Sequence, residues 1–194
     1  MTHITQAPVS AGMQNAMLAV RPIQAHEWAT YRDVRLRALQ EAPDAFGSSF
    51  AAESMRSDEA WAQRILAATT SGKDCPLFAF DDKQVCGLIW CKLSTDDALR
   101  ADLYQMWVAP EARGQGAGHA LLKAALDWAR KKGCRQVHLG VTAADSPALR
   151  LYQRHGFRAI GPLEPLREGS PLMAQAMVLG LPNQRICPHS AAAA

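Results

Sequence analysis

A glycine-rich turn between an apolar stretch and a helical pattern constrains this chain more than any other segment. It lies within Met106–Gly118, MWVAPEARGQGAG, where three glycines alternate with other residues. A turn of this kind at the start of a helix directs backbone N–H groups toward an anion, and the helix dipole favours negative charge there. The segment therefore predicts a pyrophosphate-binding turn.

The spacing of the glycines excludes two well-known phosphate loops. A dinucleotide-binding loop that starts at Gly114 and Gly116 needs a third glycine at position 119, which is His119. A nucleoside-triphosphate loop needs Lys and then Ser or Thr after its last glycine, and Gly118 is followed by His119 and Ala120. The turn thus supports neither dinucleotide nor ATP binding.

Hydrophobic periodicity around this turn predicts an α/β fold with a partly antiparallel sheet. The order is strand, two helices, three strands, helix, strand, helix and then one or two strands. The runs at 77–80 and 85–93 flank a polar turn and read as a hairpin. The expected strands cover about residues 17–23, 77–80, 85–93, 100–108, 137–141 and 172–179, and the expected helices about 26–41, 58–68, 116–132 and 147–155, the last capped by Asp145 or Ser146.

Composition indicates one globular domain. The chain has 194 residues, of which 48% are apolar and 20% charged. We expect a folded domain at 17–181 between tails at 1–16 and 182–194 that contribute no chemistry.

Five cysteines, an odd number without metal-ligand spacing, indicate reduced structural thiols, a cytoplasmic location and no metal site. The longest apolar run, Val85–Cys91, is far below the ~20 residues that span a bilayer, so no membrane association is expected.

Two motifs together identify a family resemblance. Arg113, Gly116 and Gly118 match the pattern [Q/R]-x-x-G-x-[G/A], and residues 148–157, ALRLYQRHGF, match A-x-x-L-Y-x-x-x-G-F. Because both motifs occur in the family's order along the chain, residues 18–181 resemble the Gcn5-related N-acetyltransferase (GNAT) superfamily. The resemblance implies the GNAT fold, a mixed and mostly antiparallel central sheet flanked by helices. Residues 35–47, RLRALQEAPDAFG, also look like the opening of bacterial members, whose first two helices and connector line the acceptor site.

The resemblance implies an acetyl-CoA-dependent N-acetyltransferase that transfers the acetyl group directly to a primary amine. Tyr152 matches the general acid that protonates the CoA sulfur, and the amides of the glycine turn, with the Arg113 side chain nearby, would hold the pyrophosphate. Asp145 stands where the family usually carries Asn, which puts a charge near a phosphate-bearing cofactor. The positions that the resemblance assigns to cofactor binding are Met106, Trp107, Val108, Arg113, Gly114, Gln115, Gly116, Ala117, Gly118, Asp145, Ala148 and Tyr152.

The general base has several candidates. Strand alternation predicts that Asp102 shares a face with Tyr104, Met106 and Val108. Asp102 also stands eleven residues before Arg113, where a glutamate base occurs in members of the family that acetylate protein lysines. Glu53 or a chain of waters to solvent are the alternatives.

Charge is unevenly distributed along the chain. The formal net charge is +3, but residues 110–160 hold nine Lys and Arg against three acids, and the remainder is acidic. This division suits a polyanionic CoA and an amine acceptor better than a nucleic acid. The acids Glu53, Asp58, Glu59, Asp96, Asp97 and Asp102 either attract a cationic amine or form a solvated face.

Other readings stay open at this stage. The chain could be a catalytically silent acyl-CoA-binding regulatory domain, or bind nucleic acid through its basic helices. The acceptor is not identified, with polyamines, amino acids, antibiotics and protein N-termini all compatible. A homodimer is common in the superfamily, so self-association is open as well.

Overall fold

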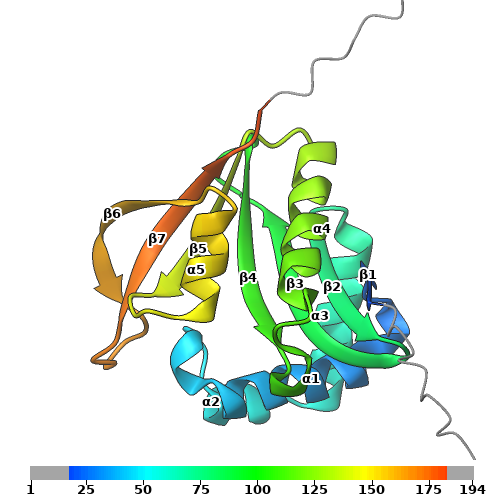
Figure 1. Cartoon of the computed structure of the whole chain (residues 1–194). Coiled ribbons are helices and arrows are strands. Elements are labelled where there is room, and N and C mark those ends of the chain that lie inside the picture. The colour runs from blue at the N-terminus through cyan, green and yellow to red at the C-terminus, as the bar shows by residue number, and fades with distance from the viewer. Residues whose placement is uncertain (1–17, 183–194) are drawn as a thin grey trace, which may run out of the picture.

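A seven-stranded mixed sheet lies between two layers of helices in the computed structural model, which describes residues 18–182 (Figure 1). The strands are β1 (Leu18–Pro22), β2 (Asp74–Asp81), β3 (Gln84–Leu93), β4 (Arg100–Val108), β5 (Gln136–Thr142), β6 (Arg158–Pro165) and β7 (Met173–Gly180). The α-helices are α1 (Trp28–Glu41), α2 (Phe50–Ser54), α3 (Asp58–Ser71), α4 (Ala117–Lys131) and α5 (Pro147–Arg154). Short 3-10 turns are η1 (Ala25–Glu27), η2 (Pro43–Ala45) and η3 (Pro110–Ala112).

The strand order is β1-β2-β3-β4-β5-β7-β6, and every neighbouring pair is antiparallel except the parallel pair β4 and β5. This confirms the prediction of a mixed, mostly antiparallel sheet flanked by helices. Periodicity did not predict α2, because a helix of five residues is too short to show a period. Both of the last two strands form, although β6 is exposed along its whole length and has no apolar alternation.

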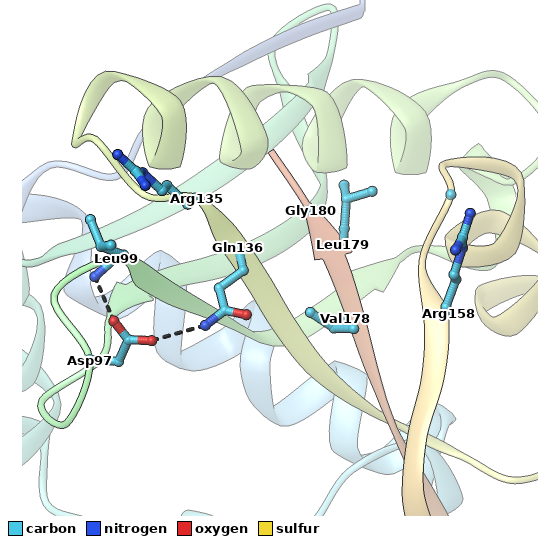
Figure 2. Close-up of a pocket in the computed structure, with 9 residues that line it drawn as sticks. Asp97, Leu99, Arg135, Gln136, Arg158, Val178, Leu179 and Gly180 are labelled. Carbon is cyan, nitrogen blue, oxygen red and sulfur yellow. Dashed lines mark hydrogen bonds between the residues drawn. The ribbon is translucent and has the colours of Figure 1, made fainter. Parts of the chain in front are cut away.

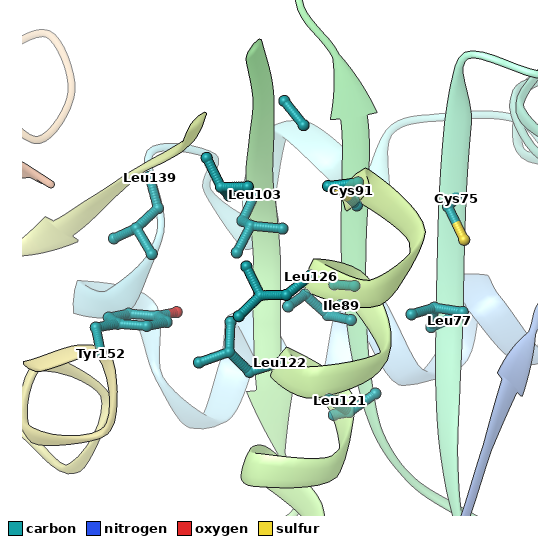
Figure 3. Close-up of a cluster of buried hydrophobic side chains, with 14 of the residues drawn as sticks. Cys75, Leu77, Ile89, Cys91, Leu103, Leu121, Leu122, Leu126, Leu139 and Tyr152 are labelled. Atoms are coloured by element: carbon teal, nitrogen blue, oxygen red, sulfur yellow. The ribbon is translucent and has the colours of Figure 1, made fainter. Parts of the chain in front are cut away.

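Two hydrophobic clusters cover the two faces of the sheet. On one face, α4 packs Leu121, Leu122 and Leu126 against β2, β3 and β4 (Figure 3). On the opposite face, α1 and α3 bury Tyr31 and Trp61, together with side chains of β2 and β3. In Figure 1, α4 and α5 lie in front of the sheet, with α1 and α3 behind it.

A β-bulge in β4 changes which side chains share a face. Trp90 pairs with Tyr104 and Leu88 with Trp107, so three steps along β4 oppose two along β3. Gln105, in this stretch, has a positive φ of 58°. Before the bulge, Leu103 packs in the cluster under α4, and after it Met106 and Val108 do the same.

One sequence prediction is therefore wrong. Asp102 shares the face toward α1 and α3 with Tyr104, as predicted, but Met106 and Val108 lie on the other face. The extra residue at the bulge reverses the alternation, and this reversal depends on the pairing with β3 rather than on the sequence of β4.

β4 and β5 separate beyond a short parallel contact. Their pairing runs only from Arg100 opposite Gln136 to Leu103 opposite Leu139, although β4 continues to Val108 and β5 to Thr142. Figure 1 shows the two strands close together at one end and spread apart at the other. Residues 104–108 of β4 therefore have no backbone partner on β5, and we call this unpaired edge the opening between β4 and β5.

Three further expectations concern the termini, the membrane and the thiols. The predicted tails lie almost entirely outside the described residues. No helix within residues 18–182 is long and apolar enough to cross a membrane. Four of the cysteines, at positions 75, 86, 91 and 134, are buried free thiols, and burial raises the pKa of Cys75 to about 11. Cys187 lies beyond the described part of the chain.

Candidate active site

The predicted pyrophosphate turn has a backbone that only glycine adopts easily. Gly114 and Gly116 have φ values of 79° and 92°, in the left-handed region that disfavours a Cβ. Gly116 is the N-cap of α4 and supplies no side-chain cap, and the first turn of that helix contains no acidic residue. The N–H groups at the start of α4 therefore point out of a positive helix end without an internal anion.

The Arg113 side chain turns away from this helix end. Its Nη2 donates to Glu41 Oε2 at 2.6 Å, and its Nε donates to the Val108 carbonyl at 3.0 Å. Trp107 Nε1 donates to the same Glu41 oxygen at 2.9 Å. The hydrogen bond from Arg113 lowers the pKa of Glu41, which keeps its charge. Arg113 thus ties the turn to the end of α1, a role that the sequence did not indicate because Glu41 is 72 residues away.

Tyr152 on α5 is buried beside β4. Its hydroxyl donates to Met106 Sδ at 3.3 Å, and its ring makes an edge contact with Phe157 at 5.7 Å. Figure 3 shows the hydroxyl directed toward β4. Burial raises the pKa of Tyr152 well above its usual value, so the phenol keeps its proton across the physiological range.

Gly118 brings the turn and Tyr152 to the same strand. A Cβ at Gly118 would lie 3.4 Å from both Leu151 Cδ2 and Met106 Cε, so α4 begins close against α5 and β4. Met106 therefore contacts the start of α4 and the Tyr152 hydroxyl at once. The two motifs, which are more than 30 residues apart in sequence, converge on one residue of β4.

The start of α5 resolves one open prediction. Ser146 Oγ accepts from Leu149 N at 3.1 Å and caps the helix, whereas Asp145 is exposed and pairs with Arg150. Ala148 is exposed in the first turn of α5. Asp145 and Ala148 thus stand on the surface at the beginning of the helix that carries Tyr152.

A contact between two histidines also joins α4 to the end of α5 near the turn. His119 Nδ1 and His155 Nε2 lie 2.9 Å apart, and the rings are 4.8 Å apart between centroids. Burial, followed by the His119 and Arg154 charges, lowers the pKa of His155. The sequence showed no spacing that would have paired these two residues.

A cavity of about 890 Å³ opens on the face of the sheet toward α1 and α3. Asp102, Tyr104 and Gln105 line it from β4. Gln105 also accepts a hydrogen bond from the Tyr31 hydroxyl at 2.8 Å, which holds the bulge against α1. Because Gln105 precedes Met106, the bulge separates this cavity from the buried hydroxyl of Tyr152. We call it the acceptor cavity, for the role that we propose for it.

The two candidate bases have different surroundings. Asp102 lines the acceptor cavity, where its Oδ1 accepts from Arg100 Nη2 at 2.6 Å and Nε at 2.9 Å. Glu53 is buried in α2 and does not line that cavity. Its carboxylate lies 3.5 Å from both Arg35 and Arg56 and 4.0 Å from Arg64. Glu53 is thus the counter-ion of an arginine cluster.

A second hollow, of about 740 Å³, lies at the other end of the sheet (Figure 2). It is near the first residues of β4 and β5, away from the glycine turn that follows β4. Asp97 there accepts from Leu99 N at 2.8 Å and from Gln136 Nε2 at 2.9 Å. Its carboxylate is already satisfied. Gly156 of the second motif borders this hollow, but neither Tyr152 nor any residue of the glycine turn lines it.

Comparisons with solved structures agree with this fold. A GCN5-related N-acetyltransferase from Kribbella flavida is 26% identical, with a TM-score of 0.65, covering 84% of this chain and 98% of that one. A putative acetyltransferase from Salmonella typhimurium, solved with its cofactor acetyl-CoA, is 17% identical with a TM-score of 0.71, covering 86% of this chain and 95% of that one.

Sequence comparisons also find acetyltransferases, in matches that cover part of this chain. Mycothiol acetyltransferase of Clavibacter sepedonicus is 39% identical over 77 residues, which is 40% of this chain. The matched stretch spans only 24% of that relative's length. The model of the acetyltransferase (GNAT) family matches residues 35–157, from α1 to the end of the tyrosine motif. The chain therefore belongs to the acetyltransferase (GNAT) family.

Proposed function

We propose that the protein is an acetyl-CoA-dependent N-acetyltransferase that transfers an acetyl group directly to a primary amine. The observation that carries the proposal is the meeting of the glycine turn and the Tyr152 hydroxyl at Met106, beside the opening between β4 and β5. The acceptor cavity on the other face of the bulge leaves room for a second substrate. Direct transfer needs both substrates bound at once with their reacting groups together, and these two places beside β4 offer room for both.

The residues around the opening suit CoA. The start of α4 offers uncapped N–H groups and no acid, as a pyrophosphate requires. Met106, Trp107 and Val108 follow the last β4 residue that pairs with β5, so this edge of β4 can pair with an extended pantetheine arm. Acetyl-CoA, when bound, supplies the thioester whose acetyl group is transferred.

Each chemical role falls to a different residue. Tyr152 holds its proton because of its raised pKa, and we assign it to protonate the departing sulfur. Asp102 faces the acceptor cavity, and we assign it to take the proton from the amine, directly or through a water. The buried cysteines need no role in direct transfer.

The test uses two glycines at opposite ends of α4. Gly116→Ala and Gly133→Ala each put a Cβ on a left-handed glycine, with φ of 92° and 81°. Both should cost about 1–2 kcal/mol of stability. Calorimetric titration with acetyl-CoA should show at least a tenfold weaker affinity for Gly116→Ala and wild-type affinity for the Gly133→Ala control.

Release of CoA in the presence of a panel of amines completes the test. Binding of acetyl-CoA with no acetylation of any amine would favour a silent acyl-CoA-binding domain instead. Equal affinities of the two glycine variants would remove the turn from the binding site.

A further inference from the structure

Arg35 of α1 lines the acceptor cavity with donors that have no partner. Its side chain is only 2% exposed, yet Nε and Nη1 make no hydrogen bond within residues 18–182. A buried guanidinium normally has its N–H groups satisfied, because each unpaired donor loses its hydration without compensation. Glu53 Oε2 beside them is likewise buried and makes no hydrogen bond within these residues. The two unpaired donors outnumber this one unpaired acceptor, so the site can take further acceptor atoms from a ligand in the cavity.

The charges around Arg35 call for an anionic ligand. Arg35, Arg56 and Arg64 all line the cavity and share Glu53 as the carboxylate near them, so positive charge exceeds negative charge in this cluster. Their distances to Glu53, 3.5 to 4.0 Å, are longer than those of a close charge-assisted hydrogen bond. We call Arg35, Arg56 and Arg64 the arginine cluster.

Aromatic rings hold the arginine cluster in place. The Arg35 guanidinium lies 4.7 Å from the centroid of Phe46, and that of Arg64 lies 5.2 Å from Trp90. Arg56 lies 5.9 Å from the centroid of Trp61. Positioned guanidinium groups lose less conformational entropy when they bind a ligand than free ones do.

The remaining acids of the cavity lie on its strand side or are already engaged. Asp102 and Asp96 line it from β4 and the segment that precedes β4. Asp74 accepts a hydrogen bond from Trp90 Nε1 at 2.8 Å. Of the acids expected to attract an amine, Asp58, Glu59 and Asp97 do not line the cavity. Lys92 and Arg100 also line the strand side, and Arg100 pairs with Asp102 beside the bulge. The cavity thus carries more cations than acids, and its helix side is cationic.

We propose that the acceptor carries a carboxylate as well as its amine, and that the arginine cluster binds this carboxylate. The proposal rests on the proposed acetyltransferase function and names the class of its acceptor. A carboxylate offers only acceptor atoms, which suits the unpaired donors of Arg35, and its charge balances the cluster. An amino acid, or a peptide with a free C-terminus, then places its amine toward Asp102 and the bulge.

The experiment compares acceptors that differ only in this group. Amino acids, ω-amino acids and dipeptides are assayed for CoA release beside their C-terminal amides, with O-phosphoethanolamine as a phosphate-bearing amine. We expect kcat/KM for the accepted carboxylate compound to exceed that of its amide by about tenfold or more, as for a hydrogen bond to a charged group. Equal use of the amide, or a preference for the phosphate compound, overturns the proposal while leaving the acetyltransferase function in place.

Variants assign the effect to the arginine cluster. Arg64→Gln keeps the buried Arg35–Glu53 contact and should reduce the preference for the carboxylate acceptor over its amide about tenfold, through a higher KM for the carboxylate acceptor. Arg35→Lys should also reduce the preference for the carboxylate acceptor over its amide, and it retains a positive charge beside Glu53. Arg32→Gln is the matched control. Arg32 lies on α1, as Arg35 does, but it pairs with Asp33 and Asp58 and does not line the cavity.

The outcomes separate the two proposals. Unchanged discrimination in both cluster variants overturns the carboxylate site alone. Absence of acetylation with every amine, together with no binding of acetyl-CoA, overturns the acetyltransferase function and the carboxylate site with it.

Discussion

Tyr152 keeps its phenolic proton because burial raises the pKa of the side chain, whose hydroxyl donates to Met106 Sδ. We expect Tyr152→Phe to lower kcat by about 10²-fold, the lower end of what one positioned proton donor contributes. The KM for acetyl-CoA should stay within about twofold. Steady-state rates measured from pH 6 to 9.5 test this, and turnover equal to wild type across that range would contradict the role of Tyr152.

The wild-type pH profile carries a second expectation for the same residue. Because burial raises the pKa of Tyr152, loss of its proton should not lower the rate near the usual tyrosine value of about 10. A decline in kcat below pH 9 would therefore have to come from another group.

Asp102 is the second residue with an assigned proton. Asp102→Asn keeps the shape of the side chain but removes the base, so kcat should fall at least tenfold at pH 7. The loss should shrink toward pH 10, since the acceptor amine then loses its proton to solvent. A loss that is constant over pH would indicate that Asp102 serves only to hold Arg100.

The contact between α4 and α5 depends on pH through His155. Burial is the largest cause that lowers the pKa of His155, so the folded protein binds a proton there less readily than the unfolded chain does. The free energy of unfolding should therefore fall as the pH drops below about 6.5, the unfolded value, and level off below the folded pKa.

Thermal melts of wild type and His155→Gln test this between pH 7.5 and 5. The variant should lose less of its Tm than wild type over that interval. His138 has a pKa lowered in the same direction and is present in both proteins, so the comparison isolates His155. An identical decline in the two proteins would exclude the His119–His155 contact as a source of the pH dependence.

At the scale of elements, the bulge in β4 does most to arrange the site. It turns Asp102 and Tyr104 toward one face and Met106 toward the other, so one strand serves two compartments. The separation of β4 from β5 begins just before it, after Leu103. A regular β4 would have placed Asp102 and Met106 on the same side.

Across the whole molecule, distant segments enclose the acceptor cavity. Arg167, between β6 and β7, donates to the Pro43 carbonyl at 3.0 Å and the Phe46 carbonyl at 2.9 Å. Thr142 Oγ1 donates to the Asp44 carbonyl at 2.5 Å. The connector between α1 and α2, which contributes Phe46 to the cavity, is therefore held by the C-terminal half of the sheet.

Loss of this closure should affect the acceptor and not the cofactor. Arg167→Ala should raise KM for the acceptor by about three- to tenfold through loss of hydrogen bonds from a charged group. Acetyl-CoA affinity by calorimetry should not change. Lys131→Ala, an exposed cation at the end of α4, is the control of equal charge change. Weaker acetyl-CoA binding by Arg167→Ala would show that the connector supports the whole site.

Features that depend on neighbouring residues could be predicted from the sequence alone. Gly114 and Gly116 predict the turn, because a left-handed backbone favours glycine. Tyr152 lies in a short helix, α5, whose end is followed by the left-handed Gly156. Strand and helix periods are likewise local, and the predicted 100–108 strand forms as β4. The mixed fold and the family followed from these patterns.

Contacts between residues that are distant in sequence could not be predicted in this way. The sheet face on which Asp102 lies depends on the register of β4 with β3. The position of the Arg113 side chain depends on its contact with Glu41. The unpaired donors of Arg35 depend on how the helices pack over the sheet. No local period encodes such contacts, because each is set by how separate elements pack. The backbone of the glycine turn was therefore predictable from the sequence, whereas the arginine cluster formed only when α1, α2 and α3 packed together.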